Sequence, residues 1–426
     1  MERGMLQQFR RVLSKPNFAK LWTGQSVSWF GDSLYFLSLL WLVQEMTGSK
    51  AMMGLVAVAR TVPQLLGFVA GALVDRLNKR NSMVAVSVCQ ALLVSCIPLF
   101  KVFGVLRVWH IPFVAFGLAL LGTFFFPARQ ALLPDLVEQH ELVTANALMS
   151  VSQQTVSLLG YSTGGLFIAS FGVMPLFALD AATFVVAAIA IWLLDIRKSG
   201  TEVLEANPAG RTHVFGDVVQ GIRFIGTTRA LIIAIPLSIA INFLFAPLSV
   251  LMPAWVTEVL NREADAYGFI QSAMMVGMVV GSFVAGLLAQ HLSKSGLILG
   301  GIVMTGLSLV AFAISRNIWL VLACMAAFGL SNAVTNVLFT AYIQSIVPRD
   351  MIGRVFGAVG TIGQVAVPVG QALAGLLGET YPLPLVFGCQ GAVTALLAGI
   401  YLLWPGIRQV FDQAEVPIPT ASAEIS

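Results

Sequence analysis

Three ionisable residues, Asp32, Arg60 and Asp180, stand inside long apolar stretches of the sequence. Asp32 falls near the middle of the first stretch, where a charge costs roughly 2.5–3.5 kcal/mol on membrane-insertion scales. Desolvation favours the uncharged form of a carboxyl group, which lets it hold a proton and release it when water or a cation arrives. We therefore predict that Asp32 couples to protons or binds a cationic substrate. A structural hydrogen bond is the alternative.

Arg60, well inside the second apolar stretch, is the obvious candidate for the counter-ion of Asp32. Two buried opposite charges on neighbouring helices offset part of each other's desolvation. The sequence leaves open whether the two side chains meet. Asp180 lies nearer the outer end of the sixth stretch, where we expect water to reach it, and we include it in the same predicted site.

A second group of charges separates the second and third apolar stretches. Residues 71–80 read Gly-Ala-Leu-Val-Asp-Arg-Leu-Asn-Lys-Arg. Anchoring at the cytoplasmic surface explains the basic residues of this segment but leaves Asp75 unexplained. We predict that Asp75 pairs with Arg129, near the end of the fourth stretch, or with the end of the eleventh, in a cytoplasmic gate that locks the outward-open state. The predicted gate residues are Gly71, Asp75, Arg76, Lys79, Arg80 and Arg129.

The composition indicates a chain that crosses a membrane many times. Apolar residues make up 58% of the 426 residues and charged residues only 10%, against about 25% charged residues in soluble proteins. A helix needs about 20 apolar residues to cross a bilayer. The sequence therefore predicts an all-α membrane protein with 12 transmembrane helices. The predicted spans are residues 18–44, 51–75, 81–103, 109–133, 143–170, 174–195, 230–257, 267–291, 295–315, 318–344, 354–378 and 383–404.

The basic residues fall on alternate connections between these spans. By the positive-inside rule this distribution places both termini in the cytoplasm. The net charge of +4 follows from that distribution, so we expect no nucleic-acid partner. The cysteines lie within apolar stretches and show no metal-binding spacing with the histidines. We therefore expect no disulfide, no metal and no cofactor.

The two halves of the sequence repeat one another. Phe-Val-Ala-Gly in the second span recurs in the eighth, and residues 137–147 align with 347–357. The latter register also pairs glycines of the fifth and eleventh spans: Gly160 with Gly370 and Gly165 with Gly375. Echoes at corresponding spans indicate a six-plus-six duplication, which predicts two pseudo-symmetric six-helix bundles.

The longest polar interruption falls between these halves and sets the predicted domain boundaries. Part of it has the spacing of an amphipathic surface helix, at 214–224. The predicted units are a cytoplasmic N-terminus at 1–17, a first bundle at 18–195, a cytoplasmic linker at 196–229, a second bundle at 230–404 and a disordered cytoplasmic tail at 405–426.

Several of these segments resemble the major facilitator superfamily. Residues 71–80 are similar to its loop signature G-x-L-x-D-R-x-G-R-K, with Asn78 in place of glycine. Residues 160–165 resemble its antiporter motif G-P-x-x-G-G, with Tyr161 in place of proline. In the family that motif lies at the junction of the halves and is associated with exporters. The motif glycines here are Gly160, Gly164 and Gly165.

The chain also resembles the macrolide-efflux branch of drug:proton antiporters. The resemblance runs over residues 15–405 and includes Gly31-Asp32 and the Pro-Ala-Arg-Gln-Ala-Leu-Leu-Pro segment at 127–134. It implies the major facilitator fold, alternating access and proton-coupled efflux of amphiphilic small molecules such as macrolide-like drugs. It also implies a monomer in the bacterial inner or plasma membrane. The fourth span lacks the mid-helix arginine that many proton-coupled drug antiporters carry.

Other functions remain open at this stage. An apolar, aromatic-rich cavity with few charges suits bulky amphiphiles better than sugars. A dedicated exporter of one product, such as a siderophore, a peptide antibiotic or a lipid, is the first alternative, and a non-transporting receptor or scaffold is the second. The sequence has no Walker loop and no catalytic triad pattern, so we expect neither an ATP-driven pump nor an enzyme. Polar residues on the spans expected to line a cavity are Gln25, Gln153, Gln154, Asn242, Asn332, Asn336 and Gln364.

Overall fold

The computed structural model describes residues 2–67, 77–195, 223–289, 292–348 and 351–404. Within these ranges the regular structure is helical and there is no strand. Three predicted gate residues, Gly71, Asp75 and Arg76, lie outside the described residues. Most of the predicted amphipathic helix and the whole C-terminal tail lie outside them as well.

The long helices of the first half begin after a short helix, α1 (Glu2–Leu13). They are α2 (Pro16–Thr47), α3 (Lys50–Thr61), α5 (Lys79–Val102), α6 (His110–Leu132), α7 (Leu142–Phe171) and α8 (Met174–Trp192). Those of the second half are α10 (Arg229–Ala254), α11 (Ala264–Leu288), α12 (Lys294–Ile314), α13 (Ile318–Ile346), α14 (Ile352–Thr380) and α15 (Leu383–Leu403). Short helical turns are η1 (Val62–Leu66), η2 (Leu133–Asp135), η3 (Gln139–Glu141) and η5 (Trp255–Val259).

Ten helices of the described part are long and apolar enough to cross a membrane. The other two predicted spans correspond to α3 and α7. Helix α3 continues through η1 to residue 67, where the described stretch ends. Helix α7 is 30 residues long and free of charged residues, but its first half is rich in serine, glutamine and threonine. The helices therefore confirm the predicted all-α membrane fold.

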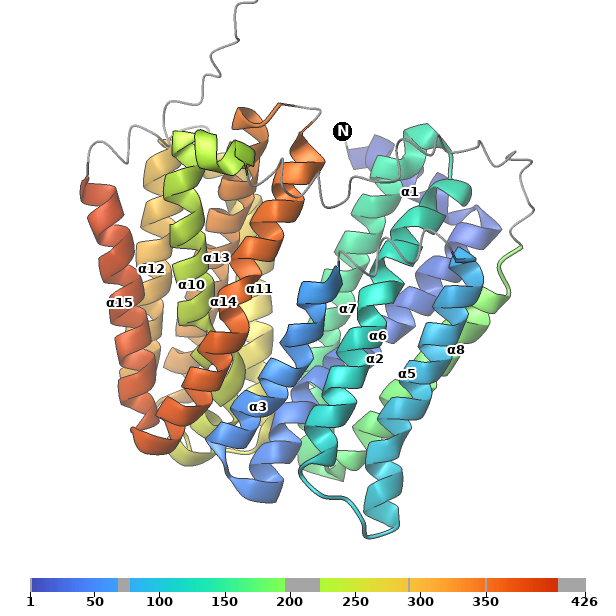
Figure 1. The fold of residues 1–426 in the computed structure, drawn as a ribbon, viewed down its shortest axis with the longest axis horizontal. Coiled ribbons are helices and arrows are strands. Elements are labelled where there is room, and N and C mark those ends of the chain that lie inside the picture. Colours follow the sequence, from blue (N-terminus) through green and yellow to red (C-terminus); the bar gives the residue numbers. More distant parts are fainter. Residues whose placement is uncertain (1, 68–76, 196–222, 290–291, 349–350, 405–426) are drawn as a thin grey trace, which may run out of the picture.

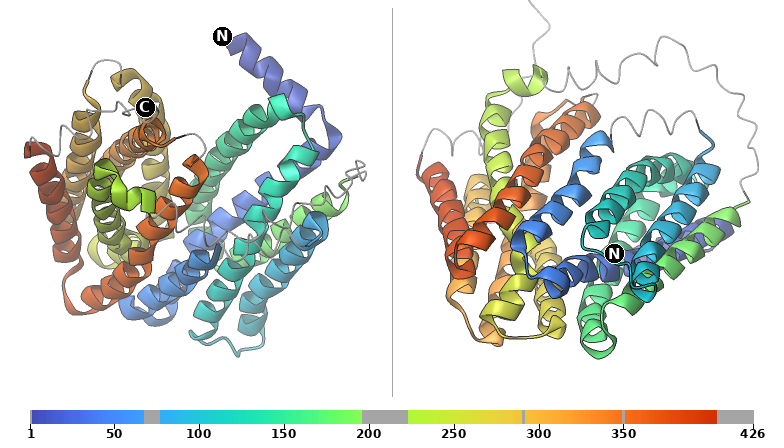
Figure 2. Two further views of the ribbon diagram at one scale, coloured as in Figure 1. Left: turned by 45° about the horizontal axis from the view of Figure 1, so that its top comes forward. Right: turned by 60° about the horizontal axis from the view of Figure 1, so that its bottom comes forward.

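The helices form two bundles that lie side by side (Figure 1). In the first half α2 packs against α7 and α8, and α5 packs against α6 and α8. In the second half α10 packs against α14 and α15, and α12 packs against α13 and α15. These contacts correspond pair by pair when the halves are superposed in chain order, which confirms the predicted pseudo-symmetric bundles. Figure 2 shows the same two groups from two further directions.

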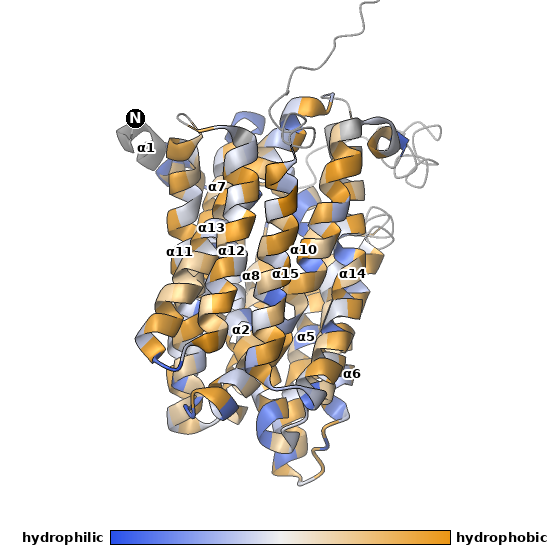
Figure 3. Cartoon of the chain, turned by 90° about the vertical axis from the view of Figure 1, so that its left-hand side faces the viewer, coloured by the Kyte–Doolittle hydropathy of each residue, from blue (hydrophilic) through white to orange (hydrophobic). Residues whose placement is uncertain are grey.

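The outer surface of the bundles is apolar. Large hydrophobic side chains such as Leu92, Phe113, Phe283 and Leu396 are exposed, and hydrophobic residues predominate along the helices (Figure 3). Soluble monomers rarely expose continuous apolar surface of this extent. Lipid hydrocarbon can cover it, so the exterior fits a protein that is embedded in a bilayer.

The polar bonds between the halves lie toward one end of the bundles. We call this the Lys50 end, and the opposite end, which carries α1, the α1 end. Lys50 Nζ lies 2.7 Å from Glu258 Oε1, and the Lys50 backbone N–H donates to Glu379 Oε2 at 2.8 Å. In the second half of α7, the Ser162 and Ser272 hydroxyls form a hydrogen bond of 2.8 Å. Among the described residues, these polar bonds join the halves on the Lys50 side.

Two glycine pairs bring the halves into close contact. A Cβ atom placed on Gly165 of α7 would lie 2.8 Å from the Cα of Gly268 in α11. A Cβ atom placed on Gly375 of α14 would lie 3.1 Å from the Cα of Gly54 in α3. Gly165 and Gly375 are counterparts in the sequence repeat, so each half contributes the equivalent helix to one of the two contacts. Small residues of this kind let helix backbones approach closely.

Candidate functional site

Two adjoining cavities, each of about 280 Å³, lie inside the first bundle. They share five wall residues, Asp32 among them, and we treat them as one space, the charged cavity. Its walls come from all six long helices of the first half. The ionisable carboxyl and guanidinium groups of its walls belong to Asp32, Arg60, Asp180 and Arg129.

Asp32 stands at the middle of α2, where this helix packs closely against α8. Gly31 permits the approach, because a Cβ atom at that position would lie 2.5 Å from Asp180 Oδ1. Asp32 nevertheless retains exposed surface, and it contributes to the walls of both parts of the charged cavity. A carboxyl group that meets a cavity inside a membrane protein can exchange a proton or bind a cation.

Arg60 lies on the same cavity but is not paired with Asp32. Its guanidinium carbon lies 4.3 Å from the centroid of the Phe36 ring, a cation–π contact that offsets part of the desolvation of the charge. Within the described part of the chain, no carboxylate comes within 4.0 Å of the Arg60 nitrogens. The structure therefore brings the two predicted partners together in one cavity without direct contact in this state.

Asp180 is more deeply buried than its position near the end of α8 suggests. Its exposed fraction is 0%, so the expectation that water reaches it is wrong for this state. Its Oδ1 accepts a weak hydrogen bond from the Thr183 hydroxyl at 3.4 Å, and its Oδ2 has no partner. The reason is packing, because α8 lies against both α2 and α5.

Arg129 lines the charged cavity as well as lying near the α1 end of α6. Its guanidinium carbon lies 5.6 Å from the Trp29 ring centroid and 5.1 Å from that of Phe126. No carboxylate of the described residues pairs with it. Sequence reasoning assigned Arg129 to the gate alone, because it could not show that α2 and α6 place Arg129 and Asp32 on one space.

Two further predicted gate residues bind within the first half. Lys79 Nζ donates to the Ala131 carbonyl oxygen at 2.8 Å and lies 3.5 Å from Asp135 Oδ2. Arg80 donates to the Trp192 carbonyl oxygen. Both side chains thus tie the start of α5 to the ends of neighbouring helices at the α1 end. Their part in a gate stays a prediction.

The motif glycines connect α7 to two different helices. A Cβ atom at Gly160 would lie 2.5 Å from the Cβ of Ser33, and one at Gly164 would lie 3.0 Å from Leu34 Cδ2. Both contacts fall on α2, immediately after Asp32. Gly165 instead faces α11 of the second half. Helix α7 therefore links the segment that carries Asp32 directly to the other bundle.

The second bundle contains a cavity in the corresponding place, but without charge. It measures about 220 Å³ and lies between α10, α12 and α13. The register that aligns 137–147 with 347–357 places Phe339 opposite Arg129, and Asn242 of α10 lines the neutral cavity as Asp32 of α2 lines the charged one. The polar wall residues of this neutral cavity are Ser238, Asn242, Thr305, Asn332, Thr335 and Asn336.

Outside the membrane spans, α1 is clamped to the connection between α6 and α7. Arg11 Nε lies 3.1 Å from Glu141 Oε1, and Lys15 forms ion pairs with Glu138 and Glu141. The hydrogen bond from Lys15 holds the pKa of Glu141 below its ordinary value. Burial alone would lower the pKa of Lys15, but hydrogen bonds to both glutamates raise it. Sequence reasoning missed this clamp, because its members lie far apart along the chain.

The chain is similar in sequence to known efflux proteins. The chain is similar to the multidrug efflux pump Tap of Mycolicibacterium fortuitum, with 27% identity over 91% of this chain and 95% of the relative. It is also similar to macrolide efflux protein A of Streptococcus pyogenes, with 24% identity over 86% of this chain and 90% of the relative.

Solved structures share the fold at low identity. The nucleoside transporter NupG (D323A mutant) superposes with a TM-score of 0.74 at 12% identity, over 91% of this chain and all of that one. A bacterial homologue of the human lysosomal transporter Spinster, in an inward-facing and unoccupied conformation, gives a TM-score of 0.68 at 12% identity over 93% of each chain. The family described as transmembrane secretion effector matches residues 11–419. The chain is therefore a membrane transporter that belongs to this family of the major facilitator superfamily.

Proposed function

We propose that this transporter is a proton-coupled exporter of amphiphilic small molecules, such as macrolide-like drugs, and that it works by alternating access. The observation that carries the proposal is the charged cavity, in which two carboxyl and two guanidinium groups line one space. Groups of opposite sign that share a cavity can take up and release a proton without leaving a lone charge in the membrane.

The positive-inside distribution supports a cytoplasmic α1 end, in a bacterial inner or plasma membrane. With that orientation, the glycine pairs and the Lys50 bonds close the outer face. The described state is then inward-facing. This assignment leaves Asp32 in contact with a cavity that serves the cytoplasm.

In this state, ionised Asp32 attracts a cationic or polar group of the cargo from the cytoplasm. Conversion to the outward-facing state exposes Asp32 to the more acidic exterior, where protonation removes its charge and weakens the attraction. The cargo leaves, and the proton is released to the cytoplasm after the return. Arg60 and Arg129 offset the charge of Asp32 when it is ionised. Helix α7 carries the change to the second bundle, because its glycines contact both α2 and α11.

The predicted cytoplasmic gate completes this cycle. In this cycle, Asp75 and Arg129 pair when the cytoplasmic side closes, and the pair separates when that side opens. Each proton that enters releases about 2.3 kcal/mol per 100 mV of membrane potential. That energy is sufficient for a monomer with no other energy source to build a useful concentration gradient of its cargo.

A substrate panel in inverted membrane vesicles tests the proposal. A pH gradient is imposed, and uptake of several macrolides and amphiphilic dyes is followed with and without an uncoupler. Movement of several compounds that collapses with the uncoupler is the expected result. Movement of a single compound would identify a dedicated exporter instead. No movement above vesicles that lack the protein would contradict transport of this class and favour a receptor or scaffold.

A further inference from the structure

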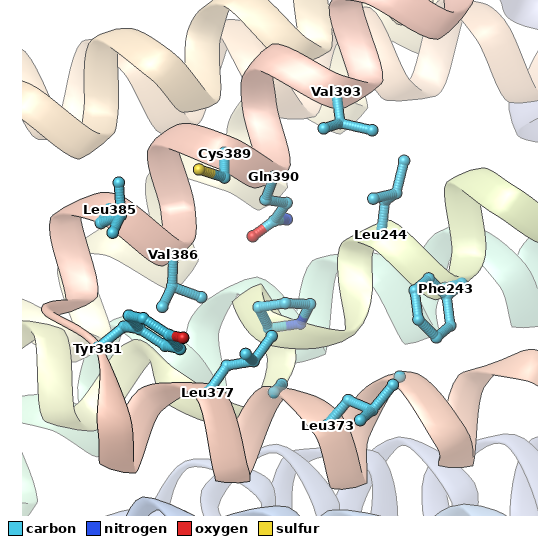
Figure 4. A pocket seen from close by; sticks show the side chains of 13 residues that line it. Phe243, Leu244, Leu373, Leu377, Tyr381, Leu385, Val386, Cys389, Gln390 and Val393 are labelled. Carbon is cyan, nitrogen blue, oxygen red and sulfur yellow. The ribbon is translucent and has the colours of Figure 1, made fainter.

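A third cavity opens on the outer side of the second bundle, away from both cavities described above. It measures about 430 Å³ and lies between α10, α14 and α15 (Figure 4). This volume is within the range of about 300–1,000 Å³ that is typical of small-molecule sites. Three of its wall residues, Leu373, Leu385 and Val393, are exposed on the apolar exterior. We call this space the lateral crevice, because it opens toward lipid.

One buried polar side chain reaches into the lateral crevice. Gln390 of α15 is 4% exposed, and neither its Nε2 nor its Oε1 has a hydrogen-bond partner. Figure 4 shows this side chain extending from α15 into the space between Leu244, Val386 and Leu377. An unpaired amide is costly away from water, and hydrocarbon offers it no partner. Gln390 is therefore available to bond a ligand that enters the crevice.

The sequence repeat gives this position a counterpart in the first half. The register that pairs Gly165 with Gly375 also pairs Asp180 with Gln390. Asp180 accepts a hydrogen bond from Thr183. The counterpart of Thr183 in the second half is Val393, which has no hydroxyl group. The second half has thus kept a polar group at this position while its local partner has been replaced by an apolar wall residue.

We propose that the lateral crevice binds a neutral amphiphile from the bilayer. The apolar body of the ligand packs against the leucine and valine walls, and a hydroxyl or carbonyl group bonds the Gln390 amide. Gln390 follows Leu383, the start of α15, by seven residues, which is about 10 Å along a helix. An ordinary acyl chain carries no polar group at that depth. The crevice therefore selects molecules whose hydrogen-bonding group lies within the hydrocarbon layer.

A native thiol provides a direct measurement of occupancy. Cys389 is exposed, lines the crevice and adjoins Gln390. In the full chain, with Cys89, Cys96 and Cys324 replaced by alanine, the rate at which a bilayer-soluble maleimide alkylates Cys389 is measured in proteoliposomes. The probes are 1-tetradecanol and tetradecane, which differ in one hydroxyl group. We expect the alcohol to protect Cys389 at concentrations about fivefold to tenfold lower than the alkane, as one hydrogen bond predicts.

Matched variants separate the amide from the shape of the crevice. Gln390→Leu should make the alcohol and the alkane equally effective, and Leu373→Trp should reduce protection by both. Gln371→Leu removes another buried glutamine with an unpaired oxygen that lies outside the crevice walls, and it should leave the difference intact. A parental melting temperature in detergent shows that each variant is folded. Equal protection by the two probes, or an alcohol preference that persists in Gln390→Leu, would overturn the proposal.

The variant Gln390→Leu also distinguishes two sources of such a ligand, exported cargo and a resident lipid-like molecule. If Gln390→Leu lowers export in the vesicle assay, the crevice holds cargo in transit. If export is unchanged while the alcohol preference disappears, the crevice holds a resident lipid-like molecule. The alkylation assay needs no pH gradient, so failure of the binding proposal there is separate from failure of the proposed function in vesicles.

Discussion

The charged cavity of the first half and the neutral cavity of the second occupy equivalent places in a duplicated fold, yet their chemistry differs. Asp32 and Ser28 of α2 lie on the walls of the first cavity, and Asn242 and Ser238 of α10 lie on the walls of the second. Arg129 of α6 corresponds to Phe339 of α13 in the sequence repeat. Both first helices thus present polar side chains to their cavities, whereas charged wall residues are found only in the first cavity.

The two halves of this fold can therefore serve different functions. Opposite charges that share one space in a membrane offset part of each other's desolvation cost. Placing them in one bundle therefore lowers the total cost. The other bundle can then offer amide and hydroxyl groups, which bind uncharged parts of a cargo without responding to pH. We infer that the first half carries the response to protons and that the second half contributes recognition.

The largest effect is expected when the first cavity is made to resemble the second. Asp32→Asn removes the only group of α2 that can change charge in the cavity, so pH-driven export should fall to the level of vesicles without the protein. Asn242→Leu is the comparison in the second half, because it removes a polar wall residue of the neutral cavity. It should keep pH-driven export and weaken cargo binding about fivefold, the effect of losing one hydrogen bond of about 1 kcal/mol.

The vesicle assay with an imposed pH gradient measures both variants side by side. Full pH-driven export by Asp32→Asn would contradict the inferred division of function between the halves, whatever the behaviour of Asn242→Leu.

A smaller effect is expected at the two glycine contacts between the halves, which are equivalent in the sequence repeat. Gly165→Val and Gly375→Val each insert a side chain into an equivalent backbone contact, and overpacking of this kind costs about 1–3 kcal/mol. We expect both variants to lower thermal stability in detergent by similar amounts. Gly399→Val is the control, because no heavy atom lies within 4 Å of a Cβ atom there. A large effect of only one interface variant would show that the two joints are not equivalent.

Much of this architecture could be predicted from the sequence, for physical reasons that apply to membranes. Hydrocarbon imposes a minimum length on apolar spans, so that the predicted span at 318–344 and helix α13 agree closely. The repeat of Gly165 and Gly375 likewise predicted a six-plus-six duplication, and the structure adds that both glycines lie at contacts between the halves.

The arrangement of the site could not be predicted in the same way. Apolar periodicity does not say which helices meet, so the shared cavity of Asp32 and Arg129 was not anticipated. The burial of Asp180 was misjudged, since its distance from a helix end says nothing about the helices packed around it. The unpaired Gln390 was not singled out, because its meaning depends on the loss of a threonine partner that only the repeat and the structure together reveal.

The smallest effect is expected at the clamp on α1, which among the described residues is found in the first half. The counterpart of Glu141 in the second half is Met351, which carries no charge. Because the folded-state pKa of Glu141 is held below its ordinary value, the clamp contributes its stability above the ordinary carboxyl pKa of about 4.3. That contribution is lost as the pH falls through the lowered pKa.

Spin-label distances between α1 and η3 can follow the clamp between neutral and strongly acidic pH. Release of α1 in acid is expected for the parent chain, and Glu141→Gln should show weakened docking at every pH with little acid dependence. Identical acid-induced release in Glu141→Gln would assign the change to another group.

The polar first half of α7 has a consequence for how the protein enters the membrane. This segment carries Gln153, Gln154 and Ser157 among its residues, and two of them, Gln153 and Ser157, face the charged cavity. Alone in lipid, α7 would expose these groups to hydrocarbon, where they have no hydrogen-bond partners. The helix is therefore a poor span by itself and a better one when packed against α2 and α11. We therefore expect insertion of α7 to be coupled to its packing, since the cavity that serves transport also shelters the polar face of this helix.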